Sequence, residues 1–211
     1  MSRSSPLLKV LVVDDHFVVR SGLVASLELE DNIRVVAEAE NTESAKAAYR
    51  THHPMVVLMD LRLPGEGCGA ATAALREIDP EARILIFSSY ARIDEIQAAL
   101  DSGALGYLQK SASLDQLLAA LRAVANGIRH VPADLERELA KFRSGPRITP
   151  REREVLGLIS SGCANKVIAD AIGVSEDTVK KHVSHILQKL EVRDRAQATT
   201  EAIRRGIVKM P

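Results

Sequence analysis

The sequence lacks the features that mark secreted or membrane-bound proteins. It has only two cysteines, Cys68 and Cys163, which lie far apart and outside any metal-ligand spacing, so it is not a disulfide scaffold. No apolar run approaches the roughly 18 residues of a membrane span, and the opening MSRSSPLL has no signal-peptide core. These absences predict two free thiols in a cytoplasmic protein without membrane contact.

Aromatic residues are also scarce, and no single charge dominates. Aromatics make up 3% of the chain and tryptophan is missing, which argues against a stacking platform for single-stranded nucleic acid. Apolar residues reach 46%, enough for a packed core. The 28 basic and 28 acidic residues cancel, but residues 1–143 hold 16 and 20, whereas residues 144–211 hold 12 and 8. The first part suits a cation or protein partners, and the second suits a polyanion.

Two kinds of segment alternate in the first part of the chain. Short runs rich in Val, Ile and Leu predict strands buried on both faces, at 7–13, 34–39, 55–59, 82–87 and 106–109. Amphipathic stretches between them predict helices at about 16–29, 41–52, 68–78, 92–102 and 113–126. This repeat indicates an α/β domain over residues 1–126, with a doubly wound, five-stranded parallel sheet.

The remainder of the chain has no strand pattern. Residues 127–146 read as a linker, in which Leu135, Leu139 and Phe142 mark a possible short helix. Residues 147–211 predict an all-α domain of four helices. Their expected starts and ends are a capping box at Thr149–Glu152 with an end near Gly162, then 165–172, then a Ser175 cap with an end near Leu190, and finally 195–205.

Polar side chains follow most of the predicted strands. Asp14 and Asp15 follow the first strand, Asp60 the third, Ser88 the fourth and Lys110 the fifth. Because ligands bind at the carboxyl ends of the strands in such sheets, we expect these groups to converge. One such Asp alone would be an ordinary turn residue. Three neighbouring carboxylates repel one another, and a hard cation such as Mg²⁺ relieves that repulsion.

This set of side chains suits phosphoryl transfer. Asp60 would be the nucleophile that accepts the phosphoryl group. Mg²⁺ and Lys110 would neutralise charge on the transferring oxygens. Ser88 would donate a hydrogen bond to a phosphoryl oxygen after transfer.

The stretches VVDDH, MDLRLPG, IFSS and GYLQK together resemble the flavodoxin-like receiver domain of bacterial two-component response regulators, over about residues 7–126. The resemblance implies that Asp60 is the phosphoacceptor. It also implies that Asp14, Asp15 and the main-chain carbonyl of Arg62 complete the metal site with Asp60.

The same resemblance implies a switch at the fourth and fifth strands. Ser88 and Lys110 match the family's switch pair, and Tyr107 matches its rotating aromatic residue. Plain packing at the sheet edge is the alternative reading of Tyr107.

The third helix of the second domain has two distinct faces. Spacings of three and four predict a buried stripe of Val179, Val183, Ile186, Leu187 and Leu190. A helix, a short turn and a helix with an exposed basic face are typical of a recognition helix in the DNA major groove. A solvated surface is the alternative. The candidate DNA-binding residues are Lys180, Lys181, Ser184 and His185 on this helix, with Thr178, Asn165 and Lys166 suited to phosphates.

The stretches ITPREREVLGLISSG, NKVIADAIGVSEDTVKKH and ILQKLEVRDR resemble the LuxR-type DNA-binding domain. Across both domains the chain resembles NarL/FixJ-type response regulators. The resemblance implies that the third helix enters the groove with Lys180 and Lys181 as base contacts. Ser184 stands where relatives are often basic, so the preferred DNA sequence is expected to differ.

The sequence therefore predicts a phosphorylation-dependent transcription regulator and not an enzyme. Its expected partners are a sensor histidine kinase, double-stranded DNA and, after phosphorylation, a second copy of the chain. One alternative is a receiver that acts unphosphorylated as an adaptor. Another is a Mg²⁺-dependent phosphotransferase, but that enzyme would need a second acid beside the nucleophile, where Leu61 and Arg62 stand.

Overall fold

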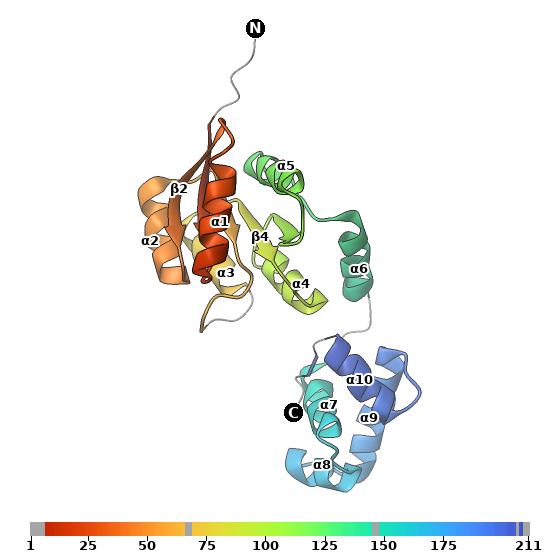
Figure 1. The fold of residues 1–211 in the computed structure, drawn as a ribbon. Coiled ribbons are helices and arrows are strands. Elements are labelled where there is room, and N and C mark those ends of the chain that lie inside the picture. Colours follow the sequence, from red (N-terminus) through yellow and green to blue (C-terminus); the bar gives the residue numbers. More distant parts are fainter. Residues whose placement is uncertain (1–6, 66–68, 145–147, 206, 209–211) are drawn as a thin grey trace. The chain divides into compact units, whose positions relative to one another are not determined.

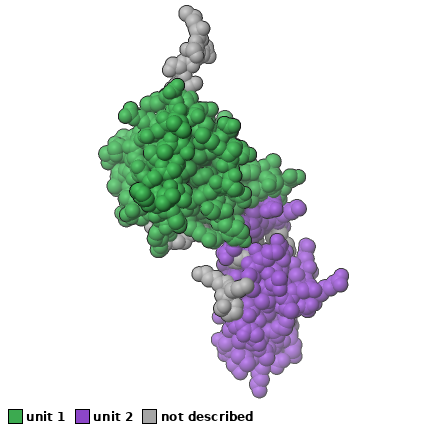
Figure 2. Space-filling model, in the orientation of Figure 1, with its two compact units in different colours: residues 1–91, 95–137 green, residues 92–94, 138–211 purple. Residues whose placement is uncertain are grey.

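The computed structural model describes residues 7–65, 69–144, 148–205 and 207–208 (Figure 1). The chain divides into two compact units (Figure 2). The first unit holds residues 1–91 and 95–137, and the second holds residues 92–94 and 138–211. Within the described part of the chain, no helix has both the length and the apolar character that crossing a membrane requires.

The first unit is built on a five-stranded parallel sheet. The strands are β1 (Leu8–Val13), β2 (Ile33–Ala39), β3 (Val56–Met59), β4 (Ile84–Ser88) and β5 (Gly106–Gln109). They pair in the order β2-β1-β3-β4-β5, and every pairing is parallel. The predicted sheet is confirmed. The order places β1 and β3 side by side at its centre, so the residues that follow these two strands are neighbours.

Helices connect the strands of this sheet. They are α1 (Phe17–Leu27), α2 (Thr42–His52), α3 (Ala70–Ile78), α4 (Ile93–Asp101) and α5 (Leu114–Ala125). Their bounds agree with the predicted ranges to within a few residues, and Cys68, in the range expected for α3, lies outside the described residues. Asn41 and Ser113 form capping boxes that fix the starts of α2 and α5.

The helices cover both faces of the sheet. Alternate strand residues such as Val12 and Leu58 share one core with Leu27 of α1 and Leu121 of α5. The strand neighbour Met59 points the other way and contacts Thr72 of α3. Side chains on a strand alternate between faces, so each buried strand contributes to two cores. The doubly wound architecture predicted from the continuous apolar runs is confirmed.

The segment after α5 attaches to the edge of the sheet beside β5. The Tyr107 N–H donates to the His130 carbonyl at 2.9 Å, and the His130 N–H donates to the Leu105 carbonyl at 3.1 Å. Gly106 has no room for a side chain there, because a Cβ would lie 2.8 Å from the His130 oxygen. Helix α6 (Ala133–Ser144) follows within the segment expected to be the linker.

The second unit is helical. Its main helices are α7 (Pro150–Ser160), α8 (Asn165–Ile172), α9 (Glu176–Leu190) and α10 (Arg195–Arg204). Gly173 ends α8 with a φ of 68°, a conformation that glycine adopts without strain. The Ser175 side chain then accepts the Thr178 N–H and begins α9. The predicted four-helix domain and this cap are confirmed. Cys163 is a free, partly buried thiol.

Candidate functional site

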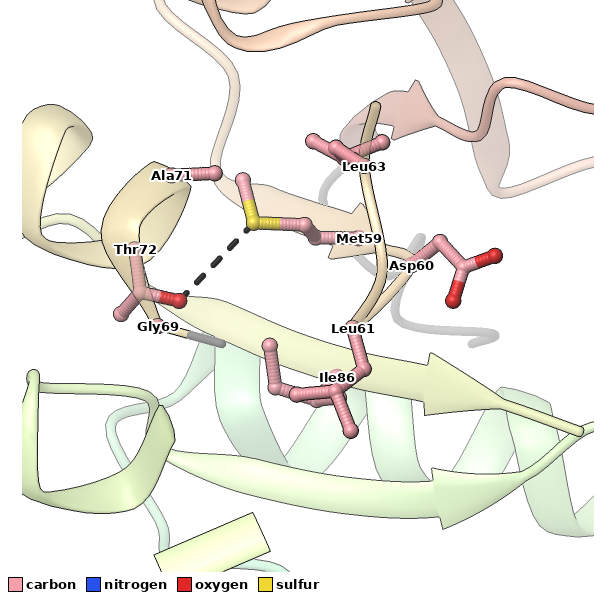
Figure 3. A pocket seen from close by; sticks show the side chains of 8 residues that line it. All are labelled: Met59, Asp60, Leu61, Leu63, Gly69, Ala71, Thr72 and Ile86. Atoms are coloured by element: carbon pink, nitrogen blue, oxygen red, sulfur yellow. Dashed lines mark hydrogen bonds between the residues drawn. The ribbon is translucent and has the colours of Figure 1, made fainter. Parts of the chain in front are cut away.

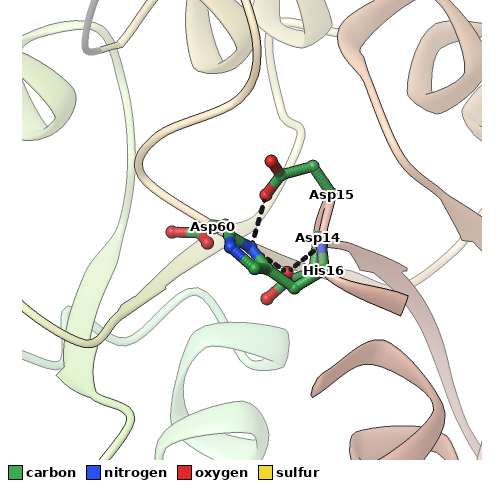
Figure 4. A group of neighbouring side chains, drawn as sticks. All are labelled: Asp14, Asp15, His16 and Asp60. Carbon is green, nitrogen blue, oxygen red and sulfur yellow. Dashed lines mark hydrogen bonds and ion pairs between the residues drawn. The ribbon is translucent and has the colours of Figure 1, made fainter. Parts of the chain in front are cut away.

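Acidic side chains meet at the carboxyl ends of β1 and β3. The Asp60 N–H donates to the Val13 carbonyl at 2.8 Å, which aligns the residues that follow the two strands. Asp14 and Asp60 are buried, with 1% and 8% of their surface exposed. One ligand atom from each of Asp14, Asp15, His16 and Asp60 lies within 4.8 Å of the others (Figure 4). We call these four residues the acid cluster.

Lys110 joins two members of the acid cluster. Its Nζ lies 2.6 Å from Asp14 Oδ2 and 2.7 Å from Asp60 Oδ2. Burial lowers the pKa of the Lys110 ammonium, but the hydrogen bonds to Asp14 and Asp60 raise it further, so the pKa ends above its ordinary value. The lysine therefore stays charged and offsets part of the repulsion between the carboxylates.

Ser88 and Tyr107 come from the two strands nearest that lysine. Ser88 ends β4 and is buried, and its hydroxyl donates to the Tyr90 carbonyl at 3.3 Å. Tyr107 lies in β5 with 1% of its surface exposed, and no described residue offers its hydroxyl a hydrogen bond. Burial raises the pKa of the Tyr107 phenol, and the carboxylates of Glu95 and Asp60 add to the increase. In this structure the ring is turned inward.

Arg62 lies two residues beyond Asp60 and holds the loop after β3. Its main-chain N–H donates to Asp60 Oδ1 at 3.3 Å. Its guanidinium donates to both oxygens of Glu95 on α4, at 3.1 and 2.9 Å. The metal ligand expected from Arg62 is its main-chain carbonyl, and that role stays a prediction.

Two further residues support Asp14, and sequence reasoning did not include either. The His16 N–H donates to Asp14 Oδ1 at 2.8 Å, and its ring Nδ1 lies 2.8 Å from Asp15 Oδ1. Arg20 donates to the Asp14 carbonyl at 2.6 Å and pairs with Glu38 at 3.1 Å. The adjacency of His16 to the aspartates was a usable signal, whereas the role of Arg20 depends on how α1 turns back over β1 and β2.

A small pocket lies beneath the loop after β3 (Figure 3). Met59, Leu63 and Ile86 line it together with Thr72, whose hydroxyl contacts the Met59 sulfur at 3.9 Å. The Asp60 carboxylate points away from the Met59 side chain (Figure 3). Most residues that line the pocket are apolar, and the Asp60 carboxylate faces the other members of the acid cluster.

The predicted recognition helix is α9 of the second unit. Val179, Ile186 and Leu190 are buried, and Val183 and Leu187 pack against the same core, so the predicted stripe is confirmed. The side chains expected to face DNA are exposed, namely Lys180, Lys181, Ser184 and His185. Lys180 Nζ lies 3.1 Å from Asp177, and that hydrogen bond is the largest of the causes that raise the Lys180 pKa.

The residues expected at phosphates lie at the starts of α8 and α9. Lys166 is exposed, and Asn165 is partly buried at the start of α8, where its Oδ1 has no hydrogen-bond partner among the described residues. The Thr178 hydroxyl lies 2.8 Å from that of Ser175. Asn165 and Lys166 therefore lie in the first turn of α8, whereas Thr178 lies in the first turn of α9.

A partly buried ion pair links α9 to α7. Lys189 Nζ lies 2.6 Å from Glu152 Oε2, and the Glu152 side chain is 5% exposed. Glu152 also accepts the Thr149 N–H at 2.8 Å and donates its own N–H to the Thr149 hydroxyl, so the predicted capping box is confirmed. The ion pair was not predicted, because its partners lie 37 residues apart.

An acid cluster on a doubly wound sheet and a helix-turn-helix unit in one chain define a two-domain signalling protein. The family model for the response regulator receiver domain matches residues 10–122. The family model for bacterial regulatory proteins of the luxR family matches residues 146–202. The chain belongs to the two-component response regulators that carry a LuxR-type DNA-binding domain.

Named relatives extend along nearly the whole chain. The transcriptional regulatory protein DegU of Brevibacillus brevis is 33% identical over 96% of both chains. The response regulator VraR of Staphylococcus aureus is 33% identical over 95% of this chain and 99% of its own. A crystal structure of the response regulator ChrA is 34% identical and covers 96% of this chain and 100% of its own, with a TM-score of 0.57. A structure of Salmonella typhimurium RcsB gives 26% identity, 92% and 98% coverage, and a TM-score of 0.75. The predicted family, fold class and function as a transcription regulator are confirmed.

Proposed function

We propose that Asp60 accepts a phosphoryl group from a sensor histidine kinase, and that this reaction controls dimerisation and DNA binding. The observation that carries the assignment is the Lys110 ammonium, 2.7 Å from Asp60 Oδ2 and 2.6 Å from Asp14 Oδ2. In this arrangement the Asp60 carboxylate is the nucleophile, and the partly buried Lys110 ammonium is a fixed positive charge for the transferred oxygens.

The transfer step exchanges one bond to phosphorus for another. An Asp60 carboxylate oxygen attacks the phosphorus of the kinase phosphohistidine, so an O–P bond forms while the N–P bond breaks. The imidazole leaves, and Asp60 becomes an acyl phosphate. Lys110 stays protonated and donates to a phosphoryl oxygen. Before transfer, the Ser88 hydroxyl donates a hydrogen bond to the Tyr90 carbonyl at 3.3 Å. After transfer, it donates to another phosphoryl oxygen instead.

The residues present suit a divalent cation, with Asp14, Asp15, Asp60 and the Arg62 carbonyl as oxygen donors. Asp15 Oδ1 supports this, because it is shielded from solvent and accepts no hydrogen bond from the described residues, and its contact with His16 Nδ1 at 2.8 Å is an ion pair. A shielded carboxylate oxygen without a hydrogen bond is stabilised by a bound cation. Mg²⁺, when bound, would neutralise charge on the phosphoryl oxygens.

Switching would then act on the fourth and fifth strands and on the helices beside them. Movement of Ser88 toward the phosphoryl group alters the loop that leads into α4, and Tyr107 has an uncommitted hydroxyl that is free to follow. The Arg62–Glu95 pair ties the phosphoacceptor loop to α4. These contacts support a route from Asp60 to a dimer face.

In the second unit, we assign base contacts to Lys180 and Lys181, with Ser184 and His185 beside them in the major groove. We assign contacts with DNA phosphates to Asn165, Lys166 and Thr178. A homodimer would read two half-sites about 10 base pairs apart, centre to centre. One solved structure of RcsB describes that protein bound to a promoter in the presence of the phosphomimetic BeF3⁻.

We assign the receiver to residues 1–126, the linker to 127–146 and the DNA-binding domain to 147–211. The two proposed partners are double-stranded DNA and a sensor kinase that carries phosphohistidine. From these partners we infer that the protein acts in the cytoplasm.

Labelling by acetyl phosphate tests the phosphoacceptor. The full-length protein should take up one phosphoryl group in the presence of Mg²⁺, and Asp60→Asn should take up none. Asp31→Asn, which alters an exposed aspartate of the same unit, is the matched control and should label normally. Persistent labelling of Asp60→Asn would overturn the assignment.

Selection of bound fragments from random duplex DNA tests the regulated output. Treatment with a phosphoryl donor should increase the yield of paired half-sites, and Asp60→Asn should not respond. Equal yields with and without donor would favour the adaptor reading. Repeated turnover of a phosphomonoester would favour a phosphotransferase.

A further inference from the structure

Arg20 of α1 reaches back to the loop that carries two of the expected cation ligands. Its Nη1 donates to the Asp14 main-chain carbonyl at 2.6 Å. That carbonyl belongs to the peptide group that joins Asp14 to Asp15. Because a peptide group is planar, its orientation sets the direction in which the Asp15 side chain leaves the main chain. The Arg20 contact therefore bears on where the Asp15 carboxylate lies within the acid cluster.

The other polar groups of Asp14 are held by different parts of the first unit. Its N–H donates to the Ala39 carbonyl at 3.0 Å. Its carboxylate accepts the His16 N–H at 2.8 Å and the Lys110 ammonium at 2.6 Å. These contacts fix the Asp14 side chain and its N–H, and the Arg20 guanidinium holds the carbonyl that leads to the next residue.

Arg20 is itself fixed by three contacts. Its Nε donates to Glu38, near the end of β2, at 3.1 Å. Its guanidinium carbon lies 5.8 Å from the centre of the Phe17 ring, and its main-chain N–H donates to the His16 carbonyl at 3.0 Å. The side chain is only 12% exposed. A guanidinium presents its donors in one rigid plane, which suits it to hold two acceptors at a fixed angle.

We propose that Arg20 is a positioning residue of the phosphoacceptor site: by fixing the peptide between Asp14 and Asp15, it keeps the Asp15 carboxylate in place to hold a divalent cation. This inference rests on the proposed function, since it concerns the same site.

The size of the effect follows from how Arg20 acts. Groups that orient metal ligands through hydrogen bonds contribute roughly 10–100-fold to metal affinity or activity. The effect of Arg20 belongs at the lower end of this range, because Arg20 acts through the main chain and the direct hydrogen bonds to the Asp14 carboxylate remain without it.

Calorimetric titration of the full-length protein with Mg²⁺ tests this role in the absence of any reaction. Arg20→Met keeps much of the apolar length of the side chain but removes every donor, so it should raise the Mg²⁺ dissociation constant about tenfold. Arg20→Lys should also bind more weakly than the wild type, because one ammonium cannot reproduce the planar fork of the guanidinium. Arg34→Met is the matched control, because Arg34 is an exposed arginine of β2, the strand that carries Glu38, and it should bind Mg²⁺ normally.

Labelling by acetyl phosphate distinguishes positioning from a purely structural role. In Arg20→Met the Mg²⁺ concentration for half-maximal labelling should rise about tenfold, and the rate at saturating Mg²⁺ should stay close to that of the wild type. A purely structural role would lower the melting temperature and leave the Mg²⁺ dependence of the folded protein unchanged. Glu38→Ala is a second variant in case Arg20→Met does not fold. It removes one anchor of the guanidinium at a carboxylate that is 46% exposed, and it should weaken Mg²⁺ binding in the same direction but less.

The outcomes separate this inference from the proposed function. If the wild type binds Mg²⁺ and is labelled, and folded Arg20→Met has the same Mg²⁺ dependence, the role of Arg20 is overturned and the phosphoacceptor assignment stays intact. Wild-type affinity in Arg20→Lys would overturn it too, because a positive charge alone would then suffice. If Arg20→Met does not fold, unchanged Mg²⁺ affinity in Glu38→Ala has the same meaning. If the wild type neither binds Mg²⁺ nor is labelled, both proposals fail.

Discussion

Replacing Lys110 by methionine tests the energetic design of the acid cluster. Methionine keeps most of the side-chain volume but removes the ammonium that lies 2.6 Å from Asp14 and 2.7 Å from Asp60. The two carboxylates are 2% and 8% exposed, so water cannot replace the missing ammonium well. Removing one partner of a buried ion pair costs about 3–5 kcal/mol, which is the decrease in unfolding free energy we expect.

The first unit offers its own probe for this decrease. The chain has no tryptophan, and its three tyrosines, Tyr49, Tyr90 and Tyr107, all lie in the first unit, so tyrosine emission reports the unfolding of that unit within the full-length protein. A decrease of this size should lower the melting midpoint by roughly 10–20 °C in the absence of divalent cations. A saturating cation should restore part of it, about 2.7 kcal/mol at a concentration of 100 times the dissociation constant.

Lys46→Met is the matched control. Lys46 pairs with Glu43 at 2.8 Å on the surface of α2, where the glutamate is 81% exposed. A surface pair of this kind contributes less than about 1 kcal/mol. If Lys110→Met melts like Lys46→Met without divalent cations, the reasoning that Lys110 compensates buried carboxylates is wrong.

Three further predictions concern other parts of the molecule. Burial raises the pKa of Glu152, but hydrogen bonds from Lys189 and Thr149 outweigh it and hold that pKa below its ordinary value of about 4.3. The stability that Glu152 contributes is therefore present above that value and is lost as the pH falls through the lower folded pKa. Urea unfolding from pH 7 to pH 3 should show this decrease in stability, and Glu152→Gln should make the pH dependence flatter. Lys181→Ala should weaken DNA binding more than Lys180→Ala, because Lys180 already pairs with an acidic neighbour. Binding titrations against the selected site and its single-base variants should show this order, together with relaxed specificity at the base that each lysine contacts. Gly106→Ala should destabilise the first unit and expose the segment after α5 to hydrogen exchange, because its Cβ would meet backbone and core side chains at 2.8–2.9 Å; unchanged exchange would contradict the close packing of that segment.

The periodic apolar pattern was enough to predict the sheet and the four C-terminal helices. The strands are buried on both faces, so their sequences are continuous apolar runs that differ plainly from the amphipathic helices between them. The aspartates at the ends of these runs were predicted to converge because ligands bind at the carboxyl ends of the strands in a doubly wound sheet. The structure adds the strand order, in which β1 and β3 are neighbours.

Interactions set by tertiary packing could not be predicted in the same way. The Lys189–Glu152 pair joins helices 37 residues apart, and nothing local distinguishes either residue from a solvated charge. The Arg62–Glu95 pair likewise depends on where α4 lies beside the loop after β3. The attachment of His130 to β5 was missed because a single bridge leaves no strand pattern in the sequence.

The central claim is that one carboxylate, that of Asp60, receives the phosphoryl group. Treatment with a phosphoryl donor, reduction of the acyl phosphate with borohydride and peptide mass spectrometry would locate the modified residue. We predict a single modified position at Asp60, formed only when a divalent cation is supplied. A modification at Asp14, at Asp15 or at any other side chain would contradict the account.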